Sequence, residues 1–155
     1  MCVYKLQICR NLLKITDMHY DTLKEILRNS GASLTQPRKV VFDLLLNQDP
    51  QSMQVLAQRA KGKVDRATVY RTVDLFERLG IARRLNIGWK YKIELADVFS
   101  GHHHHMYCTN CGRMYPLPEN PMLETMIDTV AAKSGFSPRG HQLEVFGLCV
   151  NCSKT

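Results

Sequence analysis

Two Cys-x-x-Cys pairs that lie far apart in the sequence constrain this chain more than any other feature. The first pair is Cys108 and Cys111, and the second is Cys149 and Cys152. Each pair places two thiolates on one tight turn, and two such turns complete the closed tetrahedral sulfur shell of structural zinc. A closed shell stabilises a fold and leaves no open position for catalysis. The spacing therefore predicts a four-cysteine zinc site, with a redox dithiol as the competing interpretation.

A run of four histidines, residues 102–105, comes just before the first cysteine pair. Successive side chains of an extended segment point to opposite faces, so His103 and His105 share one face while His102 and His104 share the other. Imidazoles spaced in this way can bind one or two exchangeable metal ions. The alternative is an exposed, tag-like tract that takes up metal adventitiously.

Positive charge is concentrated in the N-terminal part of the chain. The formal net charge is +7, and residues 1–95 contain 17 Lys/Arg against 9 Asp/Glu, whereas residues 96–155 contain 4 against 5. This asymmetry favours a polyanionic partner such as nucleic acid, and a merely solvated basic surface is the simpler alternative. The chain shows no secretory signal pattern and no apolar run long enough to span a bilayer. We therefore expect a cytoplasmic protein without a membrane partner, whose cysteines bind zinc in a reducing environment.

Helical periodicity and capping residues predict three short helices in the first half of the chain. The first covers residues 21–30, the second begins at the N-cap Thr35, and the third begins at the N-cap Ser52 and ends at Gly62. In the second and third helices the residues expected to face inward are Val40, Val41, Leu44, Leu45, Val55, Leu56 and Ala60.

A fourth helix, residues 66–79 after the N-cap Asp65, is the most informative one. Its apolar face is formed by Val69, Val73 and Phe76. The side chains expected roughly opposite are Thr68, Arg71 and Arg78, with Tyr70 on the flank.

Two strand-like runs, residues 81–85 and 90–95, follow this helix and predict a hairpin. Three helices followed by such a hairpin make a winged helix. An ordinary small helical domain is the alternative. The basic helix face favours the DNA-binding version, and so do the cations of the wing, which are Arg83, Arg84, Lys90 and Lys92.

The remainder of the chain predicts a hinge and a second domain. Periodicity lapses over residues 96–101, and strands are expected at residues 103–108, 113–117 and 142–148. A helix begins at Pro121, and its expected inward residues are Met122, Met126, Ile127 and Val130. A domain of about sixty residues buries little apolar surface, so zinc and a partner chain must supply what the core lacks. A homodimer is the economical solution.

These expectations define an α+β protein with an N-terminal winged helix-turn-helix domain followed by a small α/β dimerisation domain with a four-cysteine zinc site. The predicted organisation is an N-terminal extension at 1–20, a DNA-binding domain at 21–95, a hinge at 96–101 and a metal-binding dimerisation domain at 102–155.

The order of the motifs resembles the ferric uptake regulator (Fur) superfamily of iron, zinc, manganese and peroxide sensors. The resemblance extends from residue 21 to residue 153 and rests on residues 34–38, 67–72, 102–112 and 147–152. It implies a dimeric, metal-responsive transcription factor that binds double-stranded DNA and is not an enzyme.

The resemblance also assigns roles to individual residues. Tyr70 and Arg71 match positions that meet DNA in the family, and Thr68 and Arg38 are placed for phosphates. An arginine can donate two hydrogen bonds to a guanine, and a tyrosine ring can pack on a thymine methyl group. The family's structural zinc ligands are matched by Cys108, Cys111, Cys149 and Cys152.

Two sensory metal sites are implied as well. One is matched by His102, His104, Glu124 and His141, and its ligand types suit Fe2+, Zn2+ or Mn2+. The other, between the domains, is matched in part by Glu94, His103 and His105. The histidine that the family usually places near residues 49–51 is absent, and Pro116 stands where many relatives have a carboxylate. Asp97 and His19 are the two candidates to substitute for a missing ligand.

The predicted function is repression of metal homeostasis genes with metal as the corepressor. A peroxide sensor of the same family is the first alternative, and a zinc chaperone or storage protein is the second. A zinc hydrolase is disfavoured because the chain has no His-Glu-x-x-His pair, and no small-molecule substrate is expected.

Overall fold

A computed structural model describes residues 17–87, 90–118 and 120–154. The chain divides into two compact units, Met1–Gly101 and His102–Thr155. In the described part of the chain, no helix has the length and apolar content needed to cross a bilayer.

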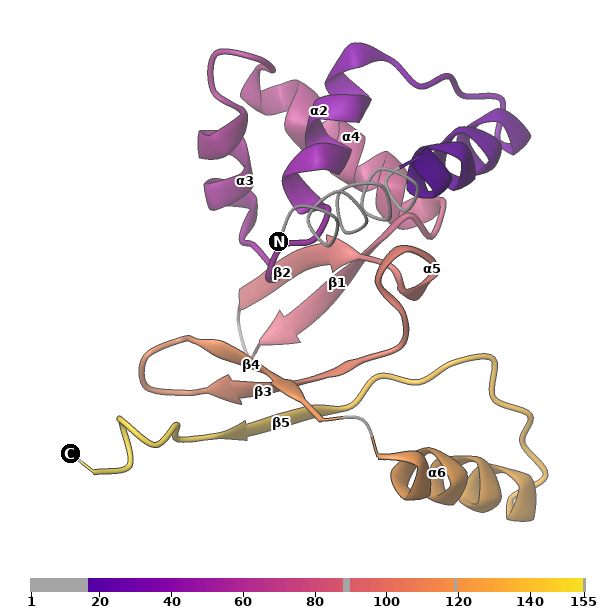
Figure 1. Cartoon of the computed structure of the whole chain (residues 1–155), viewed down its shortest axis with the longest axis vertical. Helices are drawn as coiled ribbons and strands as arrows, with labels where there is room; N and C mark the ends of the chain where they lie inside the picture. The colour runs from indigo at the N-terminus through magenta and orange to yellow at the C-terminus, as the bar shows by residue number, and fades with distance from the viewer. Residues whose placement is uncertain (1–16, 88–89, 119, 155) are drawn as a thin grey trace, which may run out of the picture. The chain divides into compact units, whose positions relative to one another are not determined.

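The helices of the first unit begin where the capping residues predict. Residues 17–29 are helical, and α2 (Gln36–Leu45), α3 (Met53–Ala60) and α4 (Arg66–Arg78) follow (Figure 1). The Ser52 hydroxyl accepts a hydrogen bond from the backbone N–H of Val55, and the Asp65 carboxylate accepts one from that of Thr68. These side chains satisfy backbone donors that lack partners in the first turn of a helix.

The core of the first unit contains one side of each helix. Its fully buried members include Leu23, Leu27, Val41, Phe42, Leu56, Val69 and Phe76. The prediction was wrong for Val55, whose side chain is 45% exposed, because α3 turns Met53, Leu56 and Ala60 inward instead. Those three positions follow helical spacing, and Val55 lies off their face.

A two-stranded antiparallel hairpin completes the first unit. It consists of β1 (Ala82–Ile87) and β2 (Lys90–Leu95), paired in register from Ala82 opposite Leu95 to Ile87 opposite Lys90. The hairpin follows α4 directly, and Ile93 also forms an isolated bridge with Gln51 ahead of α3. This order of helices and hairpin is that of a winged helix.

Residues 96–101, which the sequence predicted as an aperiodic hinge, contain a short helix. It is α5 (Asp97–Ser100), and its Phe99 is buried in the core of the first unit. The Phe99 ring packs edge-on against Phe42, with ring centroids 5.1 Å apart. A single large aromatic side chain therefore anchors this segment. One buried residue produces no periodic pattern, so the sequence analysis did not detect it.

Replacing Phe99 with alanine is expected to lower the free energy of unfolding by about 3–5 kcal/mol, because it leaves a cavity beside Phe42. Urea unfolding of the purified protein measures this loss. Val98→Ala is the matched control, since Val98 is 58% exposed and its truncation should change stability by less than about 0.5 kcal/mol. Equal effects of the two substitutions would show that α5 is not packed in solution.

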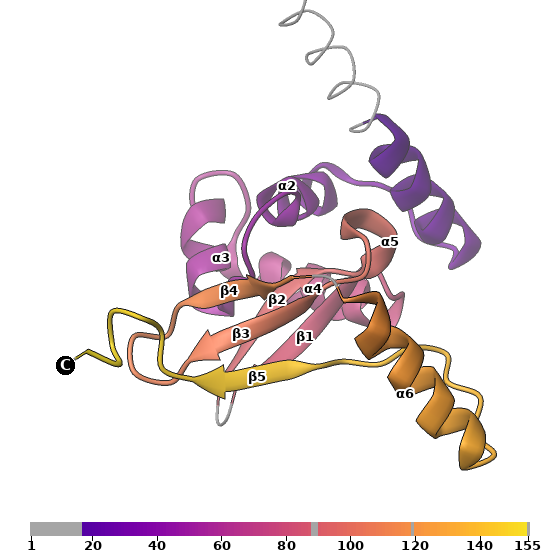
Figure 2. The same ribbon diagram turned by 60° about the horizontal axis from the view of Figure 1, so that its bottom comes forward.

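The second unit is a three-stranded sheet with one helix. Its strands are β3 (His104–Cys108), β4 (Met114–Leu117) and β5 (Glu144–Gly147), in the order β4-β3-β5. The β3–β4 pair is antiparallel, whereas β3 and β5 are parallel. Helix α6 (Pro121–Lys133) lies between β4 and β5 in the sequence and extends from one end of the sheet (Figure 2).

Three of the four α6 side chains predicted to face inward are exposed in the single chain, and the fourth, Ile127, is half-buried. Met122, Met126 and Val130 are 80%, 57% and 59% exposed, and no residue of the helix is buried. A three-stranded sheet is too small to cover this face. The helix pattern correctly identified an apolar face, which the second unit by itself leaves exposed.

Candidate metal centres and nucleic-acid interface

The four cysteines of the two Cys-x-x-Cys pairs come together in the second unit. Cys108 ends β3 and stands opposite Gly147 at the end of the parallel strand β5, two residues before Cys149. The parallel pairing therefore aligns the two cysteine turns, and the four sulfur atoms all lie within 4.8 Å of one another. All four cysteines are free thiols.

The distances and charges of this cluster suit a zinc ion. The Cys111 and Cys149 sulfurs are 3.8 Å apart, and a tetrahedron with metal–sulfur bonds of about 2.3 Å has edges of about 3.8 Å. Backbone N–H groups of Cys111 and Cys149 lower the pKa of Cys108 to about 6. The backbone N–H of Cys152 likewise lowers the pKa of Cys149. Backbone donors thus favour the thiolate form of Cys108 and Cys149, whereas the hydrogen bond with the Cys149 side chain raises the pKa of Cys152 to about 12.

A second cluster contains three imidazoles and one carboxylate. His104 begins β3 and His102 lies two residues before it, while Glu124 comes from the first turn of α6 and His141 from the segment before β5. The His104 Nε2 atom is 3.0 Å from Glu124 Oε1 and 3.2 Å from His141 Nε2. The Nε2 atoms of His102 and His141 are 3.3 Å apart.

Convergence of these four donors is the geometry that a divalent metal ion requires. A hydrogen bond from His104 is the main reason that the pKa of Glu124 lies below its usual value, so the carboxylate is ionised at neutral pH. The cluster borders a cavity of about 470 Å³ that is also lined by Asn120, Pro121 and Thr125. Nitrogen and oxygen donors of this kind fit Zn2+, Fe2+ or Mn2+.

The remaining predicted ligands lie in different units. His103 and His105 form a separate pair with ring centroids 4.8 Å apart, as the alternation along the histidine run predicts. Glu94 belongs to β2 of the first unit, where its carboxylate accepts a hydrogen bond from Arg83. The assignment of Glu94, His103 and His105 to one metal site stays a prediction.

Three of the four residues predicted to meet DNA, Thr68, Tyr70 and Arg71, lie on α4, and the fourth, Arg38, lies on α2. Tyr70 and Arg71 are exposed, and Arg71 Nη2 donates a hydrogen bond to Thr68 Oγ1 over 2.9 Å. The Arg66 guanidinium lies over the Tyr70 ring, 5.5 Å from its centroid, and donates to the tyrosine hydroxyl. Arg38 is half-buried and donates to the backbone carbonyl of Ser33. The tyrosine and Arg71 are therefore each oriented by a neighbour on the same helix.

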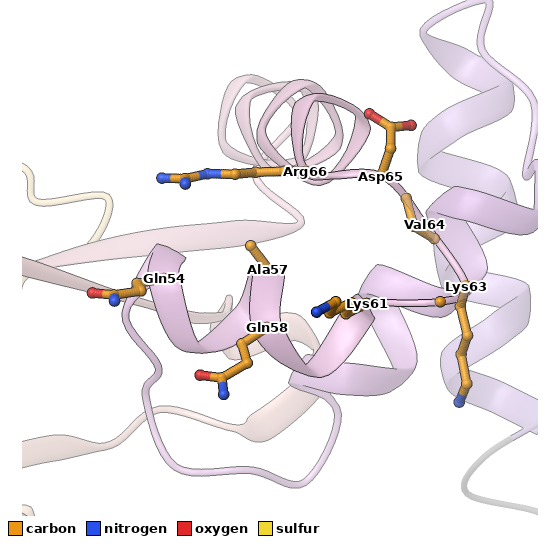
Figure 3. Close-up of a pocket in the computed structure, with 9 residues that line it drawn as sticks. Gln54, Ala57, Gln58, Lys61, Lys63, Val64, Asp65 and Arg66 are labelled. Atoms are coloured by element: carbon orange, nitrogen blue, oxygen red, sulfur yellow. The ribbon is translucent and has the colours of Figure 1, made fainter.

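A basic groove beside this face was not anticipated from the sequence. It has a volume of about 700 Å³ and lies between α3 and the beginning of α4 (Figure 3). Its polar lining consists of Gln54, Gln58, Lys61, Lys63, Asp65 and Arg66. Three cations within six residues of the connecting turn were the available signal.

Two of the four wing cations do not present a free charge to solvent, contrary to the sequence interpretation. Arg83 is only 15% exposed and pairs with Glu94 and Asp97. Arg84 makes two hydrogen bonds to Glu77 and lies over the Tyr91 ring, 4.1 Å from its centroid. Both guanidinium groups are thus paired with carboxylates, Arg83 with those of Glu94 and Asp97 and Arg84 with that of Glu77.

Comparison with known proteins agrees with this architecture. The ferric uptake regulator family matches residues 29–146. The ferric uptake regulation protein of Campylobacter jejuni is 34% identical over 150 residues, which are 90% of this chain and 94% of that protein. The peroxide operon regulator of Bacillus subtilis is 28% identical over 134 residues, covering 84% and 90% of the two chains. The solved Helicobacter pylori ferric uptake regulator shares the fold, with a TM-score of 0.75 and 19% identity over 90% of this chain and 94% of that one.

A winged helix joined to a small unit with two clusters of metal-binding side chains defines a metal-binding transcription regulator. The chain belongs to the ferric uptake regulator family. Members of this family regulate responses to metal or peroxide and are not enzymes, as the sequence predicted.

Proposed function

We propose that this protein is a metal-responsive repressor that binds operator DNA as a homodimer. Zinc occupies the four-cysteine cluster, and a second divalent ion, Fe2+, Zn2+ or Mn2+, binds the cluster of His102, His104, Glu124 and His141. The observation that carries the proposal is the convergence of three imidazole nitrogens and one carboxylate from three separate segments.

The exchangeable ion supplies positive charge that holds these donors together. Without the ion, the neighbouring imidazole nitrogens interact only through hydrogen bonds. The connection between β3, α6 and the segment before β5 is therefore weaker. A ligand shifts a conformational equilibrium only by its differential affinity for the two states. Metal therefore represses transcription if the dimer that presents both α4 helices to DNA has the more complete coordination shell.

The apolar surface of the second unit supports the homodimer. Besides α6, the exposed apolar side chains include Val145 and Phe146 of β5, and Leu148 and Val150 just beyond it. An exposed apolar surface of this extent in so small a unit is typical of an association surface. Two copies would bring two reading helices to one operator.

Substitution of Glu124 by glutamine is expected to remove most of the metal-dependent gain in operator affinity. Coupling between two sites is typically about 5–150-fold in affinity, and the variant should lose most of that factor because the only carboxylate of the cluster is gone. A mobility-shift titration of the zinc-loaded protein, with and without added Mn2+ or Fe2+, measures the factor.

Asp128→Asn is the matched control for this substitution. Asp128 is exposed and one turn further along α6, so its replacement removes a carboxylate from the same helix without touching the cluster. A Glu124→Gln variant that responds to metal like the Asp128→Asn control would refute the assignment of the sensory site.

A peroxide sensor is the second candidate, and the similarity to the Bacillus subtilis peroxide operon regulator supports it. In that case, iron bound by histidines would promote oxidation of a ligand by peroxide. Mass spectrometry of the iron-loaded protein after peroxide treatment distinguishes the two functions, because a sensor acquires 2-oxo-histidine at His103 or a neighbouring histidine. Peroxide treatment that leaves the histidines intact and operator binding unchanged favours the metal-responsive repressor.

A further inference from the structure

The wing contains a buried ion-pair network centred on Arg83. Arg83 on β1 stands directly opposite Glu94 on β2 in the hairpin register. Its Nε atom donates to Glu94 Oε1 over 2.5 Å, and its Nη1 atom is 2.8 Å from an oxygen of Asp97 at the start of α5. The side chains of Arg83 and Glu94 are 15% and 5% exposed. One guanidinium thus connects both strands of the wing with α5.

The position of this guanidinium matters because Glu94 is one of the predicted metal ligands. A guanidinium is charged at every accessible pH, and unlike a bound metal ion it cannot leave the site, because it is part of the chain. A divalent cation on the same carboxylate would have to approach a buried positive charge, and like charges at such distances repel strongly in a poorly solvated site. Arg83 already supplies the charge compensation that Glu94 needs in order to be buried.

A second guanidinium lies where the sequence lacks the expected histidine near residues 49–51. Gln51 is buried, and its side-chain oxygen accepts a hydrogen bond from Arg59 of α3. The Gln51 side-chain nitrogen donates to the backbone carbonyl of Leu44. Gln51 and Arg59 thus connect residues 44–51 to α3 through hydrogen bonds. A glutamine amide and an arginine carry no negative charge, so neither of these two residues is a suitable metal ligand.

We propose that Arg83 is a resident cation that takes the place of a metal ion at Glu94 and keeps the wing attached to α5 whether or not metal is available. The first unit is then insensitive to metal supply. The metal response depends on the cluster of His102, His104, Glu124 and His141, a consequence that rests on the function proposed above.

The decisive test counts metal ions in the Glu94→Gln variant. Equilibrium dialysis of the full-length protein against Zn2+ or Mn2+, followed by elemental analysis, is expected to give the same number of ions per chain as for the unsubstituted protein. Glu77→Gln is the matched control, because Glu77 accepts two hydrogen bonds from Arg84, the next residue of β1. Loss of one equivalent in Glu94→Gln, but not in Glu77→Gln, would show that Glu94 is a metal ligand and overturn the proposal.

The complementary test removes the guanidinium. Arg83→Met leaves a buried carboxylate without its cation, so the variant should melt at a lower temperature than the unsubstituted protein in the presence of chelator. Added Zn2+ or Mn2+ should restore part of the difference and bind as one additional equivalent per chain. Arg84→Met is the control, because Arg84, on the same strand, forms a more exposed ion pair with Glu77. This variant should bind no additional metal and should gain no stability from added metal.

An Arg83→Met variant that melts like the unsubstituted protein, or that folds and gains no metal-dependent stability, would contradict the proposal. If this variant does not fold, the Glu94→Gln metal count still decides. These measurements need no DNA. A failure of operator binding would therefore overturn the proposed repressor function without affecting the metal counts, and an altered metal count would overturn the role of Arg83 alone.

Discussion

A Cys108→Ser variant is expected to lose its tightly bound zinc and to be unable to form the folded dimer. The reason is the small amount of apolar burial in the second unit. Among the described residues from 102 onward, the only buried apolar side chain is that of Cys108 itself. Structural zinc contributes an apparent binding free energy of about 10–16 kcal/mol in small metal-dependent domains, far more than this unit's burial can replace. Folding and zinc binding are therefore expected to be coupled.

Elemental analysis should find about one chelator-resistant zinc per chain in the unsubstituted protein and almost none in the variant. Sedimentation should show a change from dimer to monomer or aggregate. Cys9→Ser is the control, since Cys9 is remote in sequence from both pairs and lies outside the described residues. A Cys108→Ser protein that keeps its zinc and remains dimeric would show that the cysteine cluster is not the structural element inferred here.

Replacing Arg71 with alanine is expected to weaken operator binding strongly while leaving the fold intact. Arg71 is exposed on α4 and donates a hydrogen bond to Thr68 on the same helix, so its loss leaves the core undisturbed. A bidentate arginine–guanine contact contributes about 1–3 kcal/mol of base discrimination. A dimer makes the contact twice, so operator affinity should fall by roughly 30-fold to more than 10⁴-fold, because each 1.4 kcal/mol is a factor of ten.

Arg71→Lys separates base reading from phosphate binding. Lysine keeps the charge but not the planar pair of donors, so this variant should lose operator preference and retain affinity for unrelated duplex DNA. Lys24→Ala is the charge control, since Lys24 lies on the helix at residues 17–29 and pairs with Asp21. Equal losses for operator and unrelated DNA in both Arg71 variants would indicate that the residue binds a phosphate and does not read a base.

Much of the secondary structure was predictable because its signals are local. Ser52 and Asp65 begin helices by accepting hydrogen bonds from backbone groups three residues further on. Positive φ angles at Gly62 and Gly80 follow the ends of α3 and α4, as a residue without a Cβ permits. The histidine run separated into the two pairs that strand alternation requires.

The errors concern side chains whose environment is set by distant parts of the fold. Val55 is an apolar residue of a type usually found in the core, yet α3 is oriented so that Met53 is buried in its place. Phe99 anchors a segment without periodicity because the Phe42 ring lies next to it. The α6 methionines have a helical apolar pattern, but the three-stranded sheet does not bury them.

The amino-acid sequence by itself determined which donors exist and which helices and strands carry them, because Cys-x-x-Cys spacing, strand alternation and helix caps depend only on neighbouring residues. Only the tertiary structure decided how these distant donors are brought together and which charges lie beside them. The parallel pairing of β3 with β5 brings the two cysteine turns together, and the hairpin register places Arg83 opposite Glu94. Strand pairing and register depend on interactions between residues that are distant in the sequence, so local patterns do not reveal them. A carboxylate such as Glu94, which the sequence suggested as a metal ligand, can therefore be neutralised by an arginine on the neighbouring strand.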